Sequence, residues 1–245
     1  MDSIYYKFSS FLQNISINNN ISTFKNNKAC TYMLEHVSYE QGLEYLTLIK
    51  KHSSFNEEDI KNYCIINDKI GEGNKYNYKF IITSPSNFRY IFYSYLILNY
   101  LNSIKNNNPT ICEVGGGYGG LCLAVNFFSA KYNINIDSYN IIDLPNVSEL
   151  QKKYISMNNS LLKINYYSSL NYGSEIESNN LFLISNYCFS ELSNENQHNY
   201  ITQLFPKVSN GFMAWNFIPV YNFGFKHYVE DEYPKTGDFN KYVYF

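Results

Sequence analysis

The sequence predicts an α/β fold, in which a mostly parallel sheet ends in a C-terminal antiparallel hairpin and follows an N-terminal helical lobe. Three observations support this prediction. Strand-like and helix-like apolar runs alternate between residues 110 and 218, which is typical of parallel strands joined by helices on both faces of a sheet. Two short strand-like runs flank a turn at residues 234–237. The first eighty residues have no strong strand. We therefore expect a helical lobe or lid over residues 1–80 and a second domain over residues 81–245.

Each predicted element has a local cause. Ser84 is a good N-cap and Pro85 suits the first helical position, so a helix begins there. Asn146 and Glu149 have the spacing of a capping box, which predicts a helix to about Met157. The predicted helices are residues 39–50, 84–104, 121–130, 146–157 and 196–208. The predicted strands are residues 110–114, 139–144, 162–167, 181–185 and 211–218, with a hairpin of residues 226–230 and 241–245.

The composition is that of a folded protein with balanced charge. The 245 residues are 45% hydrophobic and carry a formal net charge of −2, which excludes a disordered chain and a basic nucleic-acid binder. The most apolar window, residues 90–101, is shorter than the roughly 20 residues of a membrane span. The N-terminus has no signal-peptide pattern, and the five dispersed cysteines suit reduced thiols. We therefore expect a cytoplasmic protein that binds neither nucleic acid nor membrane.

A glycine-rich loop at residues 115–120 follows the first predicted strand and opens the next helix. Backbone turns tightly at such a place and can approach a ligand closely. Two interpretations are open. Glycines at 115, 117 and 120 fit the dinucleotide fingerprint, whereas Glu113 with glycines at 115, 117 and 119 fits the S-adenosylmethionine loop of methyltransferases. The loop alone does not choose between these cofactors.

Three further features favour S-adenosylmethionine. The loop lies more than a hundred residues into the chain, no Tyr-x-x-x-Lys pair follows it, and the terminal hairpin is the usual end of a methyltransferase sheet. Asp143 ends the second predicted strand, where a carboxylate can accept both hydroxyls of a ribose. The alternative for Asp143 is a simple turn residue before Pro145.

The sequence resembles the sugar O-methyltransferases, a branch of the class I S-adenosylmethionine-dependent methyltransferases with a Rossmann-like sheet. The resemblance covers about residues 30–245 and is carried by short motifs. In chain order these motifs are Glu35-His36-Val37 with Gly42, Asn67-Asp68-x-Ile70-Gly71, Ser84-Pro85-x-x-x-Arg89-Tyr90, residues 113–120, Asp143-Leu144-Pro145, Ser185-Asn186-Tyr187-x-Phe189-Ser190-Glu191-Leu192, and Pro234-x-Thr236 with Asn240.

The resemblance implies S-adenosyl-L-methionine as cofactor and a small carbohydrate as methyl acceptor. Asp143 would bind the ribose, Leu144 would pack on adenine, and Tyr167 with Ser168 would lie near the adenine ring. The full set of implied cofactor residues is Arg89, Glu113, Gly115, Gly117, Tyr118, Gly119, Asp143, Leu144, Tyr167, Ser168 and Asn186. The implied acceptor residues are Glu35, Tyr187, Ser190 and Asn216. No motif selects the sugar, its hydroxyl or an oligomeric state.

Arg89, the only arginine of the chain, has two interpretations. Its guanidinium suits a bidentate grip on the carboxylate of the cofactor. It equally suits an ion pair that ties the helical lobe to Glu113 or to another acid. Trp215 also has two interpretations: it is a core residue, or it forms a wall of the acceptor pocket.

Methyl transfer to a hydroxyl needs a proton acceptor. Glu191 is the first candidate, because it follows the fourth predicted strand and a buried carboxylate with a raised pKa suits a general base. Its alternative is a helix-start carboxylate. His36, from the helical lobe, and His227, in the terminal hairpin, are the other candidates. We expect no metal site, since the acids at 230–232 point to opposite faces of a strand.

Two rival functions remain at this stage. One is a nicotinamide-dependent oxidoreductase, to which the dinucleotide interpretation of the glycine loop leads. The other is a non-catalytic binding protein that keeps the methyltransferase fold.

Overall fold

The structure, a computed structural model, describes residues 2–18, 21–158 and 162–245. The chain divides into two compact units. We call the first, residues 1–105, 117–134 and 149–161, the helical unit. We call the second, residues 106–116, 135–148 and 162–245, the sheet unit. Each unit is discontinuous in sequence, so that segments far apart in the chain build one body.

The helical unit is formed by helices and one small ribbon. Its two-residue antiparallel strands, β1 (Tyr76–Asn77) and β2 (Ile82–Thr83), are an addition to the predicted elements. No helix in the described part of the chain is both long and apolar enough to cross a membrane. The helices are α1 (Asp2–Asn18), α2 (Lys28–Met33), α3 (Tyr39–His52), α4 (Glu57–Asp68), α5 (Pro85–Ser103) and α6 (Gly120–Ser129), and α7 (Pro145–Met157) continues into this unit.

Two helix starts follow the sequence closely. The Ser84 hydroxyl accepts a hydrogen bond from the Ser86 amide, and Pro85 occupies the first turn of α5, as predicted. Ser38 and Gln41 form a reciprocal capping box at the start of α3. These contacts are local in sequence, which is why the start of α5 was predictable.

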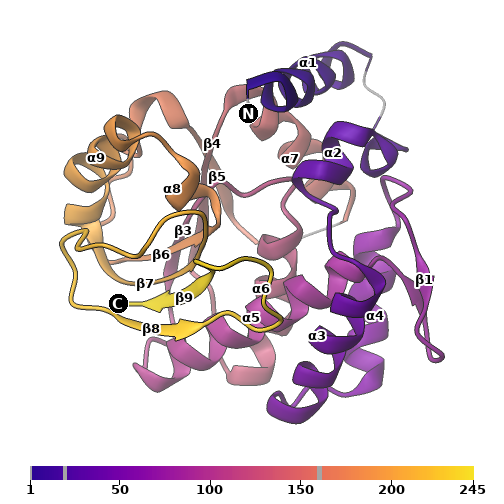
Figure 1. Ribbon diagram of the computed structural model, residues 1–245. Helices are drawn as coiled ribbons and strands as arrows, with labels where there is room; N and C mark the ends of the chain where they lie inside the picture. Colours follow the sequence, from indigo (N-terminus) through magenta and orange to yellow (C-terminus); the bar gives the residue numbers. More distant parts are fainter. Residues whose placement is uncertain (1, 19–20, 159–161) are drawn as a thin grey trace. The chain divides into compact units, whose positions relative to one another are not determined.

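The sheet unit contains a seven-stranded sheet in the order β5-β4-β3-β6-β7-β9-β8. The first five strands of this order are parallel, and β9 pairs antiparallel with both β7 and β8. This confirms the predicted fold class, including the terminal hairpin, drawn in yellow in Figure 1. The strands are β3 (Thr110–Val114), β4 (Ser138–Asp143), β5 (Ile164–Ser168), β6 (Leu181–Asn186), β7 (Val208–Trp215), β8 (Tyr228–Asp231) and β9 (Lys241–Tyr244).

Four predicted boundaries are wrong. Helix α7 begins at Pro145, so Asn146 lies inside it and is not its N-cap. Helix α9 (Asn194–Gln203) ends before Pro206, because proline disfavours helical backbone in the residue before it. Strand β7 therefore begins at Val208, earlier than predicted, and it ends at Trp215 instead of Ile218. The short helix α8 (Cys188–Glu191) had no counterpart among the predicted elements.

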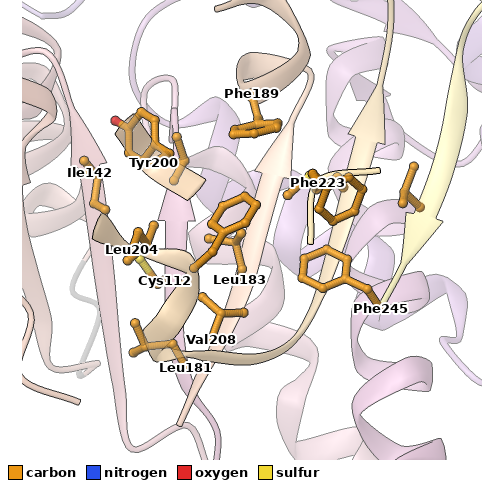
Figure 2. Packing of buried hydrophobic residues seen from close by; sticks show 14 of the residues in the cluster. Cys112, Ile142, Leu181, Leu183, Phe189, Tyr200, Leu204, Val208, Phe223 and Phe245 are labelled. Carbon is orange, nitrogen blue, oxygen red and sulfur yellow. The ribbon is translucent and has the colours of Figure 1, made fainter. Parts of the chain in front are cut away.

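The core of the sheet unit is aromatic and aliphatic, and Figure 2 labels ten of its side chains, among them Cys112 of β3, Leu183 of β6 and Val208 of β7. Trp215 is fully buried in it and packs against Phe189 and Phe223, with ring centroids 5.8 and 5.9 Å away. Its indole N–H donates to the Ile218 carbonyl at 2.8 Å. Trp215 is therefore a core residue and not the wall of a pocket.

Candidate active site

The carboxyl ends of the parallel strands meet at one edge of the sheet unit, which we call the carboxyl edge. After β3, the chain first adds β4 and β5 on one side of β3 in the sheet. It then adds β6 and β7 on the other side of β3. Open parallel sheets bind ligands outside the strand ends where the order reverses in this way. Gly115, Asp143, Asn186 and Asn216 each lie at the carboxyl end of a strand or directly after it. The topology thus brings together four residues that were predicted to form one site.

Gly115 begins the glycine loop with a φ of +78°, a backbone region that favours glycine. Its N–H donates to the Ile142 carbonyl at 3.0 Å, which continues the pairing of β3 with β4. A Cβ atom at this position would overlap the side chain of Cys188 on α8. The internal packing of the sheet unit therefore already requires glycine at residue 115.

The later glycines of the loop lie in the helical unit. Gly119 has a φ of +98° and precedes α6 as its N-cap residue, and a Cβ atom there would lie 2.7 Å from Ile155. Gly117 has a φ of +56°, and its carbonyl accepts a hydrogen bond from Gln151 at 2.9 Å. Backbone conformation and packing thus account for glycine at residue 119 as well.

Glu113 is buried inside the sheet unit, with 1% of its surface exposed. The Tyr139 hydroxyl donates to its Oε2 atom at 2.8 Å. Burial raises the pKa of Glu113 to about 8, against the ordinary value of 4.5, so the carboxyl group is mostly protonated at pH 7. Glu113 lies on β3, two residues before Gly115, and its side chain is hydrogen-bonded to Tyr139 of the neighbouring strand β4.

Four predicted cofactor residues gather at the ends of β4 and β5. Asp143 is half-buried and lies opposite Ser168 in the strand register, one position beyond the pair of Ile142 and Tyr167. Its Oδ1 atom accepts the backbone N–H of Leu144 at 2.8 Å, and the Leu144 side chain is 48% exposed. An oriented carboxylate beside an exposed apolar side chain offers the two kinds of contact that a nucleoside needs.

Asn186 ends strand β6 next to β3. Its Oδ1 atom is buried, and within the described residues it has no hydrogen-bond partner. A buried acceptor without a donor destabilises a protein by about 1–3 kcal/mol. Such an atom at the carboxyl edge fits a ligand that supplies an N–H or O–H donor.

A connected polar group lies at the carboxyl end of β7. The Ser190 hydroxyl is 2.6 Å from Asn216 Oδ1 and receives the Asn216 backbone N–H at 3.1 Å. The Asn216 amide in turn donates to Glu191 Oε1 at 2.7 Å. Three predicted residues are therefore joined. Glu191 is exposed, however, so the burial that we expected for a general base is absent.

Glu232 is a functional candidate that the sequence reasoning missed. It is 3% exposed and accepts hydrogen bonds from Thr236 at 2.6 Å, from Asn240 at 2.8 Å, and from the hydroxyl of Tyr187. Thr236 and Asn240 belong to the motifs quoted for the resemblance, and that spacing was the available signal. Glu232 thus orients Tyr187, a predicted acceptor residue.

In the helical unit, Arg89 and His36 contact each other. The Arg89 Nη1 atom donates to His36 Nε2 at 2.9 Å, and Nη2 donates to the Leu34 carbonyl at 3.1 Å. The positive charge of Arg89 and burial lower the pKa of His36 to about 3. The neutral ring hydrogen-bonds to backbone through Met33 and Tyr32, so both of its nitrogens have partners. This pairing disfavours His36 as a general base.

Glu35 and Tyr118 also contact each other. The Tyr118 hydroxyl donates to Glu35 Oε1 at 2.6 Å, and the Ser84 hydroxyl donates to Oε2 at 2.6 Å. Tyr118 is fully buried, and the Lys25 ammonium lies 4.6 Å from the centre of its ring. Lys25, a second residue that the sequence reasoning missed, donates to the Asn67 carbonyl at 2.6 Å, and burial lowers its pKa. The side chains of Glu35 and Tyr118 are therefore hydrogen-bonded to other residues of the protein.

His227 packs on the aromatic core of the sheet unit. Its ring stacks on Phe223 with centroids 4.9 Å apart, and Nδ1 lies 2.9 Å from the Phe225 carbonyl.

No cluster of metal-ligating side chains is found among the residues that the structure describes.

Comparison with known proteins gives distant structural matches only. No family model matches the chain, and no curated protein sequence matches it. An O-methyltransferase family protein from Burkholderia thailandensis shares 10% identity over 97% of this chain and 82% of its own, with a TM-score of 0.45. The mitomycin 7-O-methyltransferase MmcR shares 12% identity over 65% of this chain and 56% of its own, with a TM-score of 0.40.

CalS10, described as an amino pentose methyltransferase from Micromonospora echinaspora bound to S-adenosylmethionine, shares 8% identity over 58% of each chain, with a TM-score of 0.40. The first four matched structures are covered over 46% to 58% of their own length. At this level of similarity the matches carry no functional conclusion for this chain.

Proposed function

We propose that the chain is an S-adenosylmethionine-dependent O-methyltransferase that methylates a hydroxyl of a sugar or sugar nucleotide. One observation carries the proposal: Asp143 ends β4 and exposed Leu144 follows it, beside β3 and Gly115, at the reversal point of a sheet that finishes in an antiparallel hairpin. The motif resemblance supports the choice of cofactor over a nicotinamide dinucleotide, because the glycine loop alone fits both.

The residues at the carboxyl edge suit a nucleoside cofactor. Asp143 would accept the ribose hydroxyls, Leu144 would cover one face of the adenine, and the buried Oδ1 of Asn186 would receive a donor from the ligand. When bound, S-adenosylmethionine supplies an electrophilic methyl group. The protein then has to align the acceptor oxygen and remove its proton.

Glu191 is the proposed proton acceptor. Its carboxylate is oriented by the Asn216 amide, which is itself held by Ser190. One carboxylate oxygen of Glu191 takes the proton of the sugar hydroxyl, while Asn216 keeps the other oxygen in place. Neither His36 nor His227 has a comparable position, since His36 is engaged with Arg89 and His227 packs on Phe223.

The first experiment compares cofactors by thermal unfolding and calorimetric titration. S-adenosylhomocysteine, the demethylated cofactor, should raise the melting temperature by mass action, whereas NAD should not. Asp143→Ala should weaken S-adenosylhomocysteine by about 2–4 kcal/mol, or roughly 30- to 1,000-fold, because charge-assisted hydrogen bonds to the ribose are lost.

Asp231→Ala is the matched control, since Asp231 is exposed on β8 and pairs with Lys241. It should leave the affinity for S-adenosylhomocysteine unchanged. Stabilisation by NAD alone would establish the oxidoreductase instead. Binding of neither ligand would favour the non-catalytic protein, and equal losses for the two aspartate variants would contradict the role of Asp143.

A further inference from the structure

Two neighbouring strands of the sheet unit are followed by an aromatic residue with left-handed backbone. Tyr187, directly after β6, has a φ of +64°, and Phe217, two residues after β7, has a φ of +60°. The strands are adjacent and parallel, and the Tyr187 N–H donates to the Ala214 carbonyl at 2.8 Å. Bulky residues rarely adopt positive φ, so both positions store backbone strain at the carboxyl edge.

Phe217 is the centre of a three-residue turn. The Ile218 N–H donates to the Asn216 carbonyl at 2.7 Å across it. A turn of this kind with a positive central φ is rare and strained, and glycine would relieve the strain. On the far side, the buried indole of Trp215 donates to the Ile218 carbonyl at 2.8 Å. The turn is therefore fixed from both ends by the surrounding structure.

Burial of the ring does not compensate the strain at Phe217, because its side chain is 59% exposed. Tyr187 differs, since its hydroxyl is held by buried Glu232. An exposed aromatic ring on a strained backbone adds little to folding, where asparagine or glycine would serve better. Strain that is retained without a packing benefit is typical of functional sites.

The neighbour of Phe217 in the chain indicates what the ring does. Asn216 binds both Ser190 and Glu191, so the same short turn positions the phenyl ring and the proposed proton acceptor. Resting on the proposed function, we propose that Phe217 is the stacking surface for the methyl acceptor. Its ring packs against the apolar C–H face of a pyranose, whose hydroxyl then reaches Glu191.

Saturation-transfer NMR tests this assignment, with methyl β-D-glucoside, methyl β-D-galactoside and methyl α-L-fucoside as probes in the presence of S-adenosylhomocysteine. At least one glycoside should receive saturation on its ring protons from the parent protein. Phe217→Ala should reduce this transfer about fivefold or more, and Phe217→Tyr should retain it because the ring is kept. Phe239→Ala is the matched control, a phenylalanine that is 47% exposed between β8 and β9.

Thermal unfolding supplies the second measurement. Phe217→Gly should raise the melting temperature by about 2–4 °C, because the strain is relieved, while saturation transfer is lost. Equal transfer in the parent and in Phe217→Ala, or no transfer to any glycoside with the parent, would overturn the assignment. A lower melting temperature for Phe217→Gly would do so as well, because the residue would then be structural.

The stabilisation by S-adenosylhomocysteine separates the two proposals. It should be the same in the parent and in all Phe217 variants, since the ring contacts only the acceptor. If the parent shows no such stabilisation, the proposed function fails, whatever the glycosides do. If the stabilisation is present and the glycoside result is negative, the methyltransferase proposal stands and only the stacking role is wrong.

Discussion

Motif residues of the helical unit differ from Asn186, at the carboxyl edge of the sheet unit, in whether their side-chain polar atoms have partners within the protein. In the helical unit, Glu35 accepts both Tyr118 and Ser84, and Arg89 donates to His36. At the carboxyl edge, Asn186 keeps a buried acceptor atom without a partner among the described residues, and Glu191 is exposed. The polar atoms of Glu35 and Tyr118 are therefore paired within the protein, whereas Asn186 Oδ1 offers an acceptor to a ligand. This contrast holds for these motif residues and not for each whole unit, since Asp68 Oδ1 and Ser86 Oγ of the helical unit are also buried without a partner among the described residues.

This difference divides a set of residues that the motifs treated as one site. A buried polar group must be hydrogen-bonded, and Tyr118 meets this requirement within the protein. Substitutions of Glu35 or Tyr118 should therefore reduce the free energy of unfolding and leave ligand binding unchanged. Substitutions at the carboxyl edge should affect binding or turnover and leave folding intact.

Glu191→Gln should have the largest effect. Glutamine keeps the hydrogen bond from Asn216 but does not take a proton, so kcat should fall about 10²- to 10⁴-fold. The affinity for S-adenosylhomocysteine and the melting temperature should stay at the parent values. His36→Asn and His227→Asn belong in the same assay. If one of them abolishes turnover while Glu191→Gln remains within about threefold of the parent, that histidine is the base.

Glu113→Gln should change how stability depends on pH. The folded protein keeps the Glu113 proton up to about pH 8, whereas an unfolded glutamate releases it above about 4.5. Between these values the unfolded state binds fewer protons, so the free energy of unfolding of the parent should fall as pH rises, by up to about 1.4 kcal/mol per pH unit. The glutamine variant should show a flatter dependence.

Urea unfolding at pH 5.5, 6.5 and 7.5 measures this effect, and Glu44→Gln, at an exposed position of α3, is the control. The control should keep the slope of the parent. An unchanged slope in Glu113→Gln would mean that the buried carboxyl group is ionised when folded, and Glu113 would then offer a negative charge near the carboxyl end of β3.

Tyr118→Phe should have the smallest effect and should act on stability alone. It removes the hydroxyl that Glu35 accepts, which should lower the free energy of unfolding by about 1–3 kcal/mol. Tyr32→Phe, with a side chain that is 66% exposed, should change it by less than about 0.5 kcal/mol. If the Tyr118→Phe variant binds S-adenosylhomocysteine more weakly and its stability is unchanged, Tyr118 contacts the cofactor, as the resemblance implied.

The sequence by itself determined the elements whose causes are local. The N-cap at Ser84, the apolar runs that become β3 and β6, and the glycine loop between β3 and α6 were all predictable. Periodicity and capping depend on residues a few positions apart, and such residues keep their relation in any fold. The parallel direction of the strands also followed, because helices alternate with strands, whereas their order in the sheet was not predicted.

Only the tertiary structure decided which motif residues form hydrogen bonds with other residues of the protein. The sequence left open whether Arg89 grips the cofactor carboxylate or an acid of the protein, and the structure places its guanidinium against His36, 53 residues earlier in the chain, and the Leu34 carbonyl. Burial raises the pKa of Glu113 to about 8, and the positive φ of Phe217 arises where Trp215 binds the Ile218 carbonyl at the end of β7. Hydrogen-bond partners and burial depend on residues brought together from distant segments, and no local pattern in the sequence records those distances.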